Sequence, residues 1–236
     1  VAGKRHKNYF ESLGFNNPIE IPYDVIDNDY FRERGKQYLK HGSKILADRI
    51  GEKYILCVSR LVKRKRVDLA LEIFFKSNVH KLGWNFVLVG DGPEVDHIIS
   101  VVHKLGLTRN FIHFKNIPNH RMPAIYTGAT ALLLTSKYDQ WGLCVNEAMA
   151  CGVPVCISSR CGAANEIVKN DTGLVFSEDS IDNAINWLSE VCVDSNYHHF
   201  LSENCLKEIQ EWGVKNYARS TVRLTLTKRK EGYFYE

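Results

Sequence analysis

Short apolar runs rich in β-branched residues alternate along most of the chain with segments in which apolar residues recur every three or four positions. The first pattern is typical of buried strands, and the second is typical of helices that pack through one face. The strands predicted in this way are 54–59, 85–90, 111–114, 131–136, 153–158 and 172–176. Strands that are apolar on both faces favour a parallel sheet covered by helices.

The segments between these strands carry the helical spacing. Val67, Ala70, Leu71 and Phe74, for example, fall on one helix face. Helices are expected near 67–74, 95–102, 122–128, 143–151, 164–169 and 181–188. This regular alternation predicts an α/β fold with a doubly wound, Rossmann-like parallel sheet. Sheets of this kind bind their ligands at the carboxyl edge of the strands.

The two ends of the chain do not follow the alternation. Residues 1–18 are expected to be the end of a preceding element or a linker, followed by a lead-in strand at 19–23 and a polar turn at 24–29. Residues 19–215 are expected to form one domain, and residues 216–236, which lose the apolar period, a C-terminal tail. Because the sequence starts with valine and holds only two methionines, we expect a longer parent polypeptide.

Composition narrows the class of protein. The 236 residues are 44% hydrophobic and 25% charged, which is typical of a soluble globular chain and excludes a disordered one. No apolar run approaches the roughly 18 residues that a membrane span requires. The seven cysteines form no CxxC pair and the nine histidines no HExxH motif, so we expect buried free thiols in a cytoplasmic protein without zinc.

The loop after the first predicted strand is strongly basic. A cation at the carboxyl end of a parallel strand, with a second cation at the start of the next helix, can hold a phosphate group from two sides. Arg60 lies at that edge, so a phosphate-binding role is favoured for it, whereas Lys63, Arg64 and Arg66 fit a solvated helix start. Lys65 is the remaining one of the five cations in this loop.

Two glycines follow the second predicted strand in the sequence GDGP. A GxG after a strand suggests a dinucleotide-binding loop, but the third glycine of that fingerprint is missing here. Gly90 and Gly92 are therefore expected to form a tight strand-to-helix turn near a ligand.

The loop after the fourth predicted strand turns at Gly142 and leads into a short helix. Free amides near its N-terminus, at Leu143 and Cys144, could hold a diphosphate. Asp139 in the loop and Glu147 in the helix could face one crevice. On spacing alone an alternative is equally good, in which Asp139 caps the helix and Glu147 is a buried acid with its hydrogen bonds satisfied.

Four ordered motifs carry a resemblance to a known family: SRLVKRKRVDLALEIF, FVLVGDGPE, YDQWGLCVNEAMACGVPV and GAANEIVKNDTGLVF. Over about residues 19–188 the chain resembles the C-terminal, donor-binding half of the GT-B fold in group 1 retaining glycosyltransferases, which use nucleotide sugars. The family pattern Glu-Pro-Phe-Gly-Leu followed by Glu-Ala stands here as Asp139-Gln140-Trp141-Gly142-Leu143 with Glu147-Ala148, so the first acid is the shorter aspartate.

The resemblance implies roles for the charged residues. Arg60 and Lys65 would hold the donor diphosphate and stabilise the charge on the leaving group, with Ser59 as the small residue before the arginine. Glu147 would accept hydrogen bonds from the nucleotide ribose, and Asp139 would hold the transferred sugar. No metal or other cofactor is expected, because positioned cations and backbone dipoles can stabilise a departing diphosphate.

The resemblance also implies donor contacts made by backbone amides and by the loop that would line the base pocket. The backbone amides of Gly142 and Leu143 would hold the sugar and phosphates. The other donor contacts are expected at Gly90, Cys144, Asn116 and Ile117, the last two in the loop that would line the base pocket.

The function implied by the resemblance is transfer of a sugar, with retention, from a nucleotide-diphosphate sugar to an acceptor. The acceptor, a glycan or a lipid-linked molecule, would be held by an N-terminal domain missing from this chain. The isolated domain is therefore expected to be inactive. Its expected location is the cytoplasm, peripheral at the cytoplasmic membrane face. An alternative is a non-catalytic donor-binding subunit of a split glycosyltransferase. Nucleic-acid binding through the basic loop is disfavoured, since the net charge is only +4.

Overall fold

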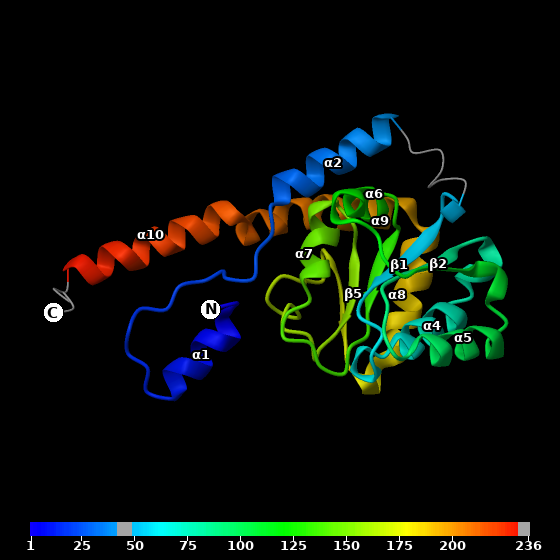
Figure 1. The fold of residues 1–236 in the computed structure, drawn as a ribbon, viewed down its shortest axis with the longest axis horizontal. Helices are drawn as coiled ribbons and strands as arrows, with labels where there is room; N and C mark the ends of the chain where they lie inside the picture. Colours follow the sequence, from blue (N-terminus) through cyan, green and yellow to red (C-terminus); the bar gives the residue numbers. More distant parts are fainter. Residues whose placement is uncertain (42–48, 231–236) are drawn as a thin grey trace.

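A parallel sheet forms the centre of the protein (Figure 1). It has six strands in the order β3-β2-β1-β4-β5-β6. The computed structural model describes residues 1–41 and 49–230. The strands are β1 (Tyr54–Val58), β2 (Asn85–Val89), β3 (Phe111–Phe114), β4 (Ala131–Leu134), β5 (Val155–Ser158) and β6 (Gly173–Phe176). The strand order reverses between β1 and β4, so the loops that follow these two strands diverge at the carboxyl edge and leave a crevice there.

Helices cover both faces of the sheet. The helices are α1 (Lys4–Ser12), α2 (Asn28–His41), α4 (Val67–Lys76), α5 (Val95–Lys104), α6 (Met122–Thr127), α7 (Leu143–Ala150), α8 (Ile181–Val193), α9 (Ser195–Glu208) and α10 (Val214–Lys230). Short 3-10 turns are η1 (Lys63–Lys65), η2 (Val79–Leu82), η3 (Thr108–Asn110), η4 (Asn119–Arg121), η5 (Glu178–Ser180) and η6 (Ile209–Trp212). None of the helices within the described ranges is long and apolar enough to cross a membrane.

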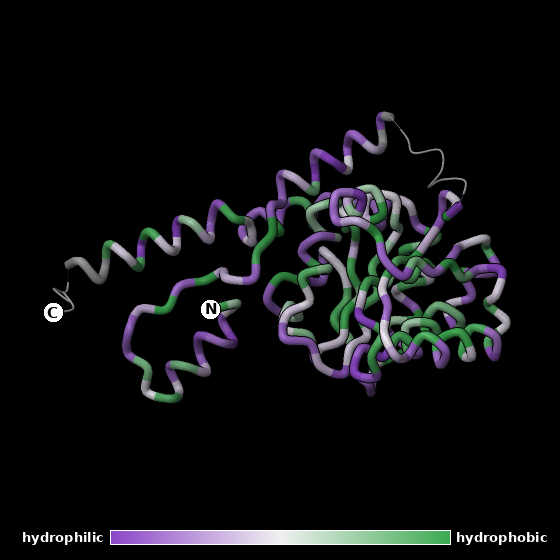
Figure 2. The backbone as a smooth tube through the Cα atoms, in the orientation of Figure 1, coloured by the Kyte–Doolittle hydropathy of each residue, from purple (hydrophilic) through white to green (hydrophobic). Residues whose placement is uncertain are grey.

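Successive residues of each central strand belong to two different apolar clusters. Leu56 and Leu132 pack on the face covered by α6 and α7, while Ile55 and Leu133 pack on the face covered by α4, α5 and α8. All four side chains are fully buried, because side chains of a strand point alternately to its two faces and both faces are covered. Figure 2 shows these strands as apolar segments inside the domain. The predicted fold class is confirmed.

Several predicted elements near the edges are wrong. Strands β1, β2 and β4 end one or two residues earlier than predicted, because Ser59, Gly90 and residues 135–136 belong to the loops, and β5 and β6 begin one or two residues later than predicted. The helix expected at 164–169 is a series of turns, since Asn165 takes a left-handed conformation with φ of 62°. Residues 19–23 are extended without joining the sheet, and the lead-in strand is absent from that part of the described chain.

Helix α2, which the sequence did not reveal, begins at the last two residues of the polar turn expected at 24–29. Its sequence is rich in charge, so it shows little apolar period, and its stability comes from packing on α6 and α7. Gly35 makes the close crossing with α6 possible: a Cβ at this position would lie 2.1 Å from Thr127 Oγ1.

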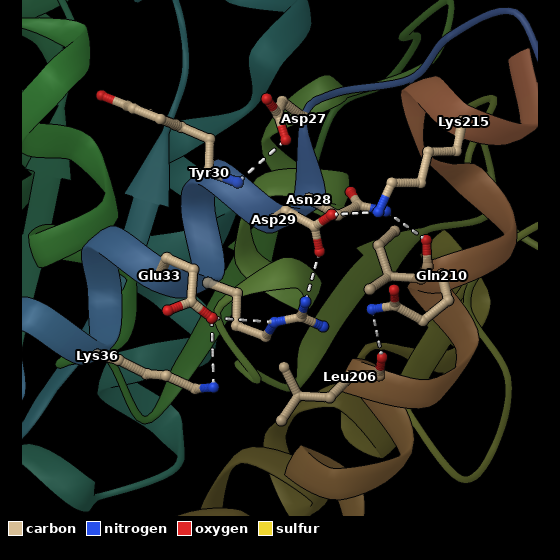
Figure 3. A network of polar contacts seen from close by, with 11 residues as sticks. Asp27, Asn28, Asp29, Tyr30, Glu33, Lys36, Leu206, Gln210 and Lys215 are labelled. Carbon is tan, nitrogen blue, oxygen red and sulfur yellow. Dashed lines mark hydrogen bonds and ion pairs between the residues drawn. The ribbon is translucent and has the colours of Figure 1, made fainter. Parts of the chain in front are cut away.

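Helix α10 occupies the region expected to be a tail without period. Figure 3 shows where it begins, beside the N-terminus of α2. Lys215 Nζ lies 2.7 Å from Asp29 Oδ2, and Asn28 Nδ2 donates to the Ile209 carbonyl at 2.7 Å. Figure 1 shows the rest of α10 extending away from the sheet, where Val222 is 57% exposed, so its sequence carries no buried stripe. Residues 231–236 lie outside the described ranges, and the division into domains stays a prediction.

Helix α1 is attached differently from the helices on the sheet. None of its residues is buried. Its first turn meets the loop after β5, where the Arg5 amide donates to Glu166 Oε1 at 2.8 Å. Gly3 lies directly against this carboxylate, since a Cβ there would be 2.5 Å from Glu166 Cδ. The Glu166 carboxylate therefore caps the helix, while just before it Ala2 is buried in the core cluster.

Candidate functional site

The loops after β1 and β2 lie against each other at the carboxyl edge of the sheet. The Ser59 amide donates to the Val89 carbonyl at 3.1 Å, and the Leu61 amide donates to the Asp91 carbonyl at 2.9 Å. A Cβ on Gly90 would lie 1.8 Å from the Ser59 carbonyl oxygen, so only glycine allows this approach. The predicted residues Ser59 and Gly90 are therefore neighbours.

The basic loop after β1 is held by the loop after β4. Thr135 Oγ1 donates to the Arg66 carbonyl at 2.6 Å, and the Lys137 amide donates to the Arg64 carbonyl at 2.7 Å. The Arg64 guanidinium returns a hydrogen bond to the Tyr138 carbonyl at 3.3 Å. The cations are thus fixed across the crevice where the strand order reverses.

An ion pair joins the two loops. The Lys65 ammonium contacts Asp139 Oδ2, and each side chain is only 13% exposed. The backbone of Asp139 is held too, since its carbonyl accepts from the Gly162 amide at 3.0 Å. Asp139 does not cap α7, because the cap position is Gly142 and no side chain bonds there.

The N-terminus of α7 has an uncompensated positive end. Gly142 takes a φ of 99°, a left-handed conformation that favours glycine, and a Cβ there would lie 2.8 Å from the Leu134 side chain. The first turn of the helix contains no acid and no capping side chain. The amides of Leu143 and Cys144 are therefore suited to an anionic ligand.

A cavity of about 1110 Å³ opens beside this helix end. The predicted residues that line it are Lys65, Asp139, Gly142, Leu143 and Cys144. Residues of the N-terminal segment line it as well, among them Arg5, His6, Tyr9 and the acid Asp24. The cavity thus lies between the edge of the sheet and α1, and three basic side chains, those of Arg5, Lys65 and Arg160, line it together with an uncapped helix end.

The other predicted residues do not line this cavity. Arg60 and Asn116 are exposed at the same edge of the sheet, and Ile117 is half-buried against the core. Asn116 and Ile117 follow β3, and the end of β3 is bonded to the β2 loop because the Gly90 amide donates to the Phe114 carbonyl at 2.9 Å. The structure therefore brings the predicted residues to one edge, in two groups.

Glu147 has a partner that the sequence does not reveal. Tyr126, on α6, is fully buried and its hydroxyl donates to Glu147 Oε2 at 2.5 Å. Burial raises the pKa of the half-buried Glu147 carboxyl, and the Tyr126 hydrogen bond opposes that rise. The two carboxylates of the site thus have different partners, a cation for Asp139 and a phenol for Glu147.

Three thiols surround the ion pair without adding a nucleophile. Burial raises the pKa of Cys57 and Cys161 to about 12, and it raises that of Cys144 well above its usual value. A thiol must ionise to attack or to bind a metal strongly, so these groups stay protonated at neutral pH.

Sequence reasoning missed Tyr126 and the α1 contribution. Tyr126 sits in an apolar helix and reads as a core aromatic; its one distinguishing signal is a polar hydroxyl in a position where phenylalanine would pack equally well. For Arg5 and Tyr9 no signal exists, since they meet the cavity only through the tertiary fold.

A comparison with family models matches residues 43–208, more than half of the chain, to the glycosyl transferases of group 1. Among curated relatives, N-acetyl-alpha-D-glucosaminyl L-malate synthase of Bacillus anthracis is 28% identical over 83% of this chain and 50% of its own length. The chain thus spans about half the length of the relatives that it matches.

Solved structures share the fold. Sucrose-phosphate synthase of Thermosynechococcus elongatus superposes with a TM-score of 0.78 at 19% identity, over 98% of this chain and 58% of its own. Anabaena Alr3699/HepE, solved in complex with UDP and glucose, gives a TM-score of 0.75 at 16% identity, over 97% and 62% of the two chains. Fold, motif order and family model agree, and the chain belongs to the group 1 glycosyltransferase family.

Proposed function

We propose that this chain binds a nucleotide-diphosphate sugar and is the donor-binding part of a retaining glycosyltransferase. The observation that carries the proposal is the convergence of Lys65, Asp139 and the uncapped N-terminus of α7 in one cavity. A diphosphate is the ligand chemistry that fits a fixed ammonium beside free helix amides.

Each group has a role in this proposal. Lys65 and the amides of Leu143 and Cys144 bind the diphosphate, and Arg60 approaches it from the exposed side of the same loop. Because charge develops on the departing diphosphate, cations and dipoles held in place before the reaction lower the barrier. The hydrogen bonds to the carbonyls of Arg64 and Arg66 provide that fixed placement.

The remaining predicted residues recognise the rest of the donor. Asp139 accepts hydrogen bonds from the transferred sugar next to Lys65, and Gly142 lets the sugar approach the backbone. Glu147 accepts from the ribose hydroxyls. The base lies on the β2–β3 side, along Gly90 and the loop of Asn116 and Ile117. No metal is needed in this scheme, since the protein's own positive groups face the phosphates.

The acceptor belongs to another part of the enzyme in this proposal. The chain spans about half the length of its relatives, and we expect an N-terminal domain to hold a glycan or lipid-linked acceptor. The isolated chain should therefore bind donor without transferring sugar. Robust transfer by the purified chain to any acceptor would contradict this part of the proposal.

Thermal unfolding with UDP, GDP, ADP, their sugars and NAD tests donor binding. A ligand at 100 times its dissociation constant adds ~2.7 kcal/mol of stability, which raises Tm by roughly 5–10 °C for a chain of this size. Glu147→Ala should abolish the shift, whereas Glu203→Ala, on the exposed side of α9, should leave it unchanged. No shift with any nucleotide would count against donor binding by this chain.

Turnover by the complete enzyme tests the proposed role of Arg60. Removing one positioned electrostatic donor lowers turnover by roughly 10²–10³ in comparable sites, so Arg60→Ala should fall in that range. The matched control is Arg109→Ala, an exposed arginine in η3 outside the site. Wild-type turnover in Arg60→Ala would remove Arg60 from the mechanism.

A further inference from the structure

The Tyr126 side chain is held more firmly than its role in the core requires. It is fully buried, and its ring packs edge-on against Phe31 of α2 with 6.2 Å between ring centroids. A phenylalanine would fill the same volume. Burying a hydroxyl is unfavourable unless it forms a hydrogen bond, and this hydroxyl has one described partner, Glu147 Oε2, at 2.5 Å.

The hydrogen bond fixes the Glu147 carboxylate. A glutamate without a fixed partner rotates about its last bonds, so the plane of its carboxylate is undefined. Here one oxygen is bound to a phenol that packing prevents from moving, so the carboxylate keeps one orientation. Oε1 stays available as an acceptor, and an ionised acceptor makes the stronger kind of hydrogen bond.

The position of Glu147 on α7 indicates what the available oxygen meets. Glu147 lies three residues after Cys144, so the two side chains emerge from neighbouring turns of one helix face. The amides of Leu143 and Cys144 begin that helix beside the cavity. An acceptor oxygen one turn behind a phosphate-binding helix end is suited to hydroxyl donors attached close to the phosphate.

We propose that Tyr126 is a positioning residue that presents Glu147 Oε1 to the ribose hydroxyls and so makes the site selective for ribonucleotides. This inference rests on the proposed donor binding. Selectivity follows because a nucleotide without these hydroxyls leaves the fixed, partly desolvated carboxylate without a hydrogen-bond partner. A mobile carboxylate would turn to water and lose less.

Binding measurements on the whole chain test the inference with two ligands. The probes are the nucleoside diphosphate that gives the thermal shift and its 2′,3′-dideoxy analogue, each titrated calorimetrically. We expect the wild type to bind the dideoxy analogue about 10- to 100-fold more weakly, the range for hydrogen bonds to a charged group. Tyr126→Phe should weaken the ribonucleotide by roughly 10-fold and leave the dideoxy analogue nearly unchanged.

A second tyrosine provides the matched control. Tyr54 is 5% exposed, and its hydroxyl donates to the Ile125 carbonyl at 2.6 Å, one residue before Tyr126. Tyr54→Phe removes a buried hydroxyl from the same region without touching Glu147, so it should keep the wild-type ratio of the two affinities. In a Glu147→Gln background, Tyr126→Phe should add little further loss of selectivity.

The outcomes separate the possible failures. Equal weakening of both ligands by Tyr126→Phe means a purely structural role and overturns the inference, as does an unchanged affinity ratio. A wild type that binds neither ligand overturns the proposed function itself. If Tyr126→Phe fails to fold, Glu147→Asp, which withdraws the carboxylate from the phenol by one methylene, should lower the ratio instead; a wild-type ratio in that variant rejects the inference.

Discussion

The sheet and helix α1 are attached to the molecule by different forces. Around the sheet, alternate strand residues enter two apolar clusters, and every helix on its faces contributes buried side chains. Helix α1 buries none of its own residues and is held through the Glu166 carboxylate at its first turn. Tyr9 on this helix is 61% exposed, and Leu13, directly after it, is 65% exposed.

The cavity lies between these two regions, so one of its walls belongs to the packed core and the other to the loosely attached helix α1. The wall with Lys65, Asp139 and the α7 N-terminus is built on the core, so its geometry is as stable as the fold. The wall with Arg5 and Tyr9 is built on an element that can open locally at low cost. We expect the wall with Lys65, Asp139 and the α7 N-terminus to stay fixed while the other wall adapts.

The largest loss of stability should come from a substitution in the core. Leu132→Ala removes a fully buried side chain of β4 and should lower the free energy of unfolding by about 2–5 kcal/mol. Leu226→Ala, on α10 where the side chain is 53% exposed, should stay within about 0.5 kcal/mol of the wild type. Urea denaturation followed by circular dichroism measures both. Similar losses in the two variants would erase the distinction between core and periphery.

The attachment of α1 should break without unfolding the sheet. In Gly3→Val the added side chain displaces the Glu166 carboxylate from the Arg5 amide. Loss of such a cap costs about 0.5–2 kcal/mol, so amide exchange in α1 should quicken by roughly 2- to 30-fold. Exchange in β1 and β4 should not change, and a parallel loss of protection there would show that α1 and the sheet unfold as one unit.

Within the core, Glu147 should lower stability at neutral pH. Because burial raises its folded-state pKa, the folded protein binds a proton more readily than the unfolded chain, and stability falls as pH rises from the unfolded pKa through the folded one. Glu147→Gln should therefore raise Tm at pH 7 by no more than about 4 °C. The gain should vanish near pH 4, and a gain that grows on acidification has the wrong sign.

The smallest effect should come from the ion pair between α2 and α10. Lys215 lowers the pKa of Asp29, so its stabilisation is present above the usual aspartate pKa and is lost as pH falls. Both side chains are exposed, and such pairs contribute little. Asp29→Asn should lower Tm by less than about 2 °C at pH 7, and the difference should shrink as pH falls below the usual aspartate pKa. A larger drop would mean that α10 depends on this contact.

How much of the fold could be predicted depends on burial. Strands such as β1 and β4, buried on both faces, are visible as apolar runs, and α4 shows its period because one face meets the sheet. Helices α2 and α10 are largely charged or exposed, so their sequences lack the signal that periodicity needs. They form because particular contacts, such as Gly35 against Thr127, exist only in the folded chain.

The candidate site divides in the same way. Lys65, Asp139 and Glu147 stand out by residue type and spacing after predicted strands, so the sequence locates them. Their partners depend on how the loops meet: Asp139 bonds to a cation 74 residues earlier and Glu147 to a buried tyrosine 21 residues earlier. One sequence without tertiary information cannot distinguish such pairs from the alternatives of a helix cap or a solvated acid.

The reversal of strand order between β1 and β4 has a consequence for how variants of this chain can arise. The proposed base contacts follow β2 and β3, whereas the proposed phosphate contacts, the ion pair and the helix end, lie on the loops after β1 and β4. Exchange of the segment from β2 to β3 between relatives would replace the residues proposed to contact the base and keep those proposed to bind the phosphates. Recombination at these boundaries offers a route to new donors in one step, without rebuilding the chemistry.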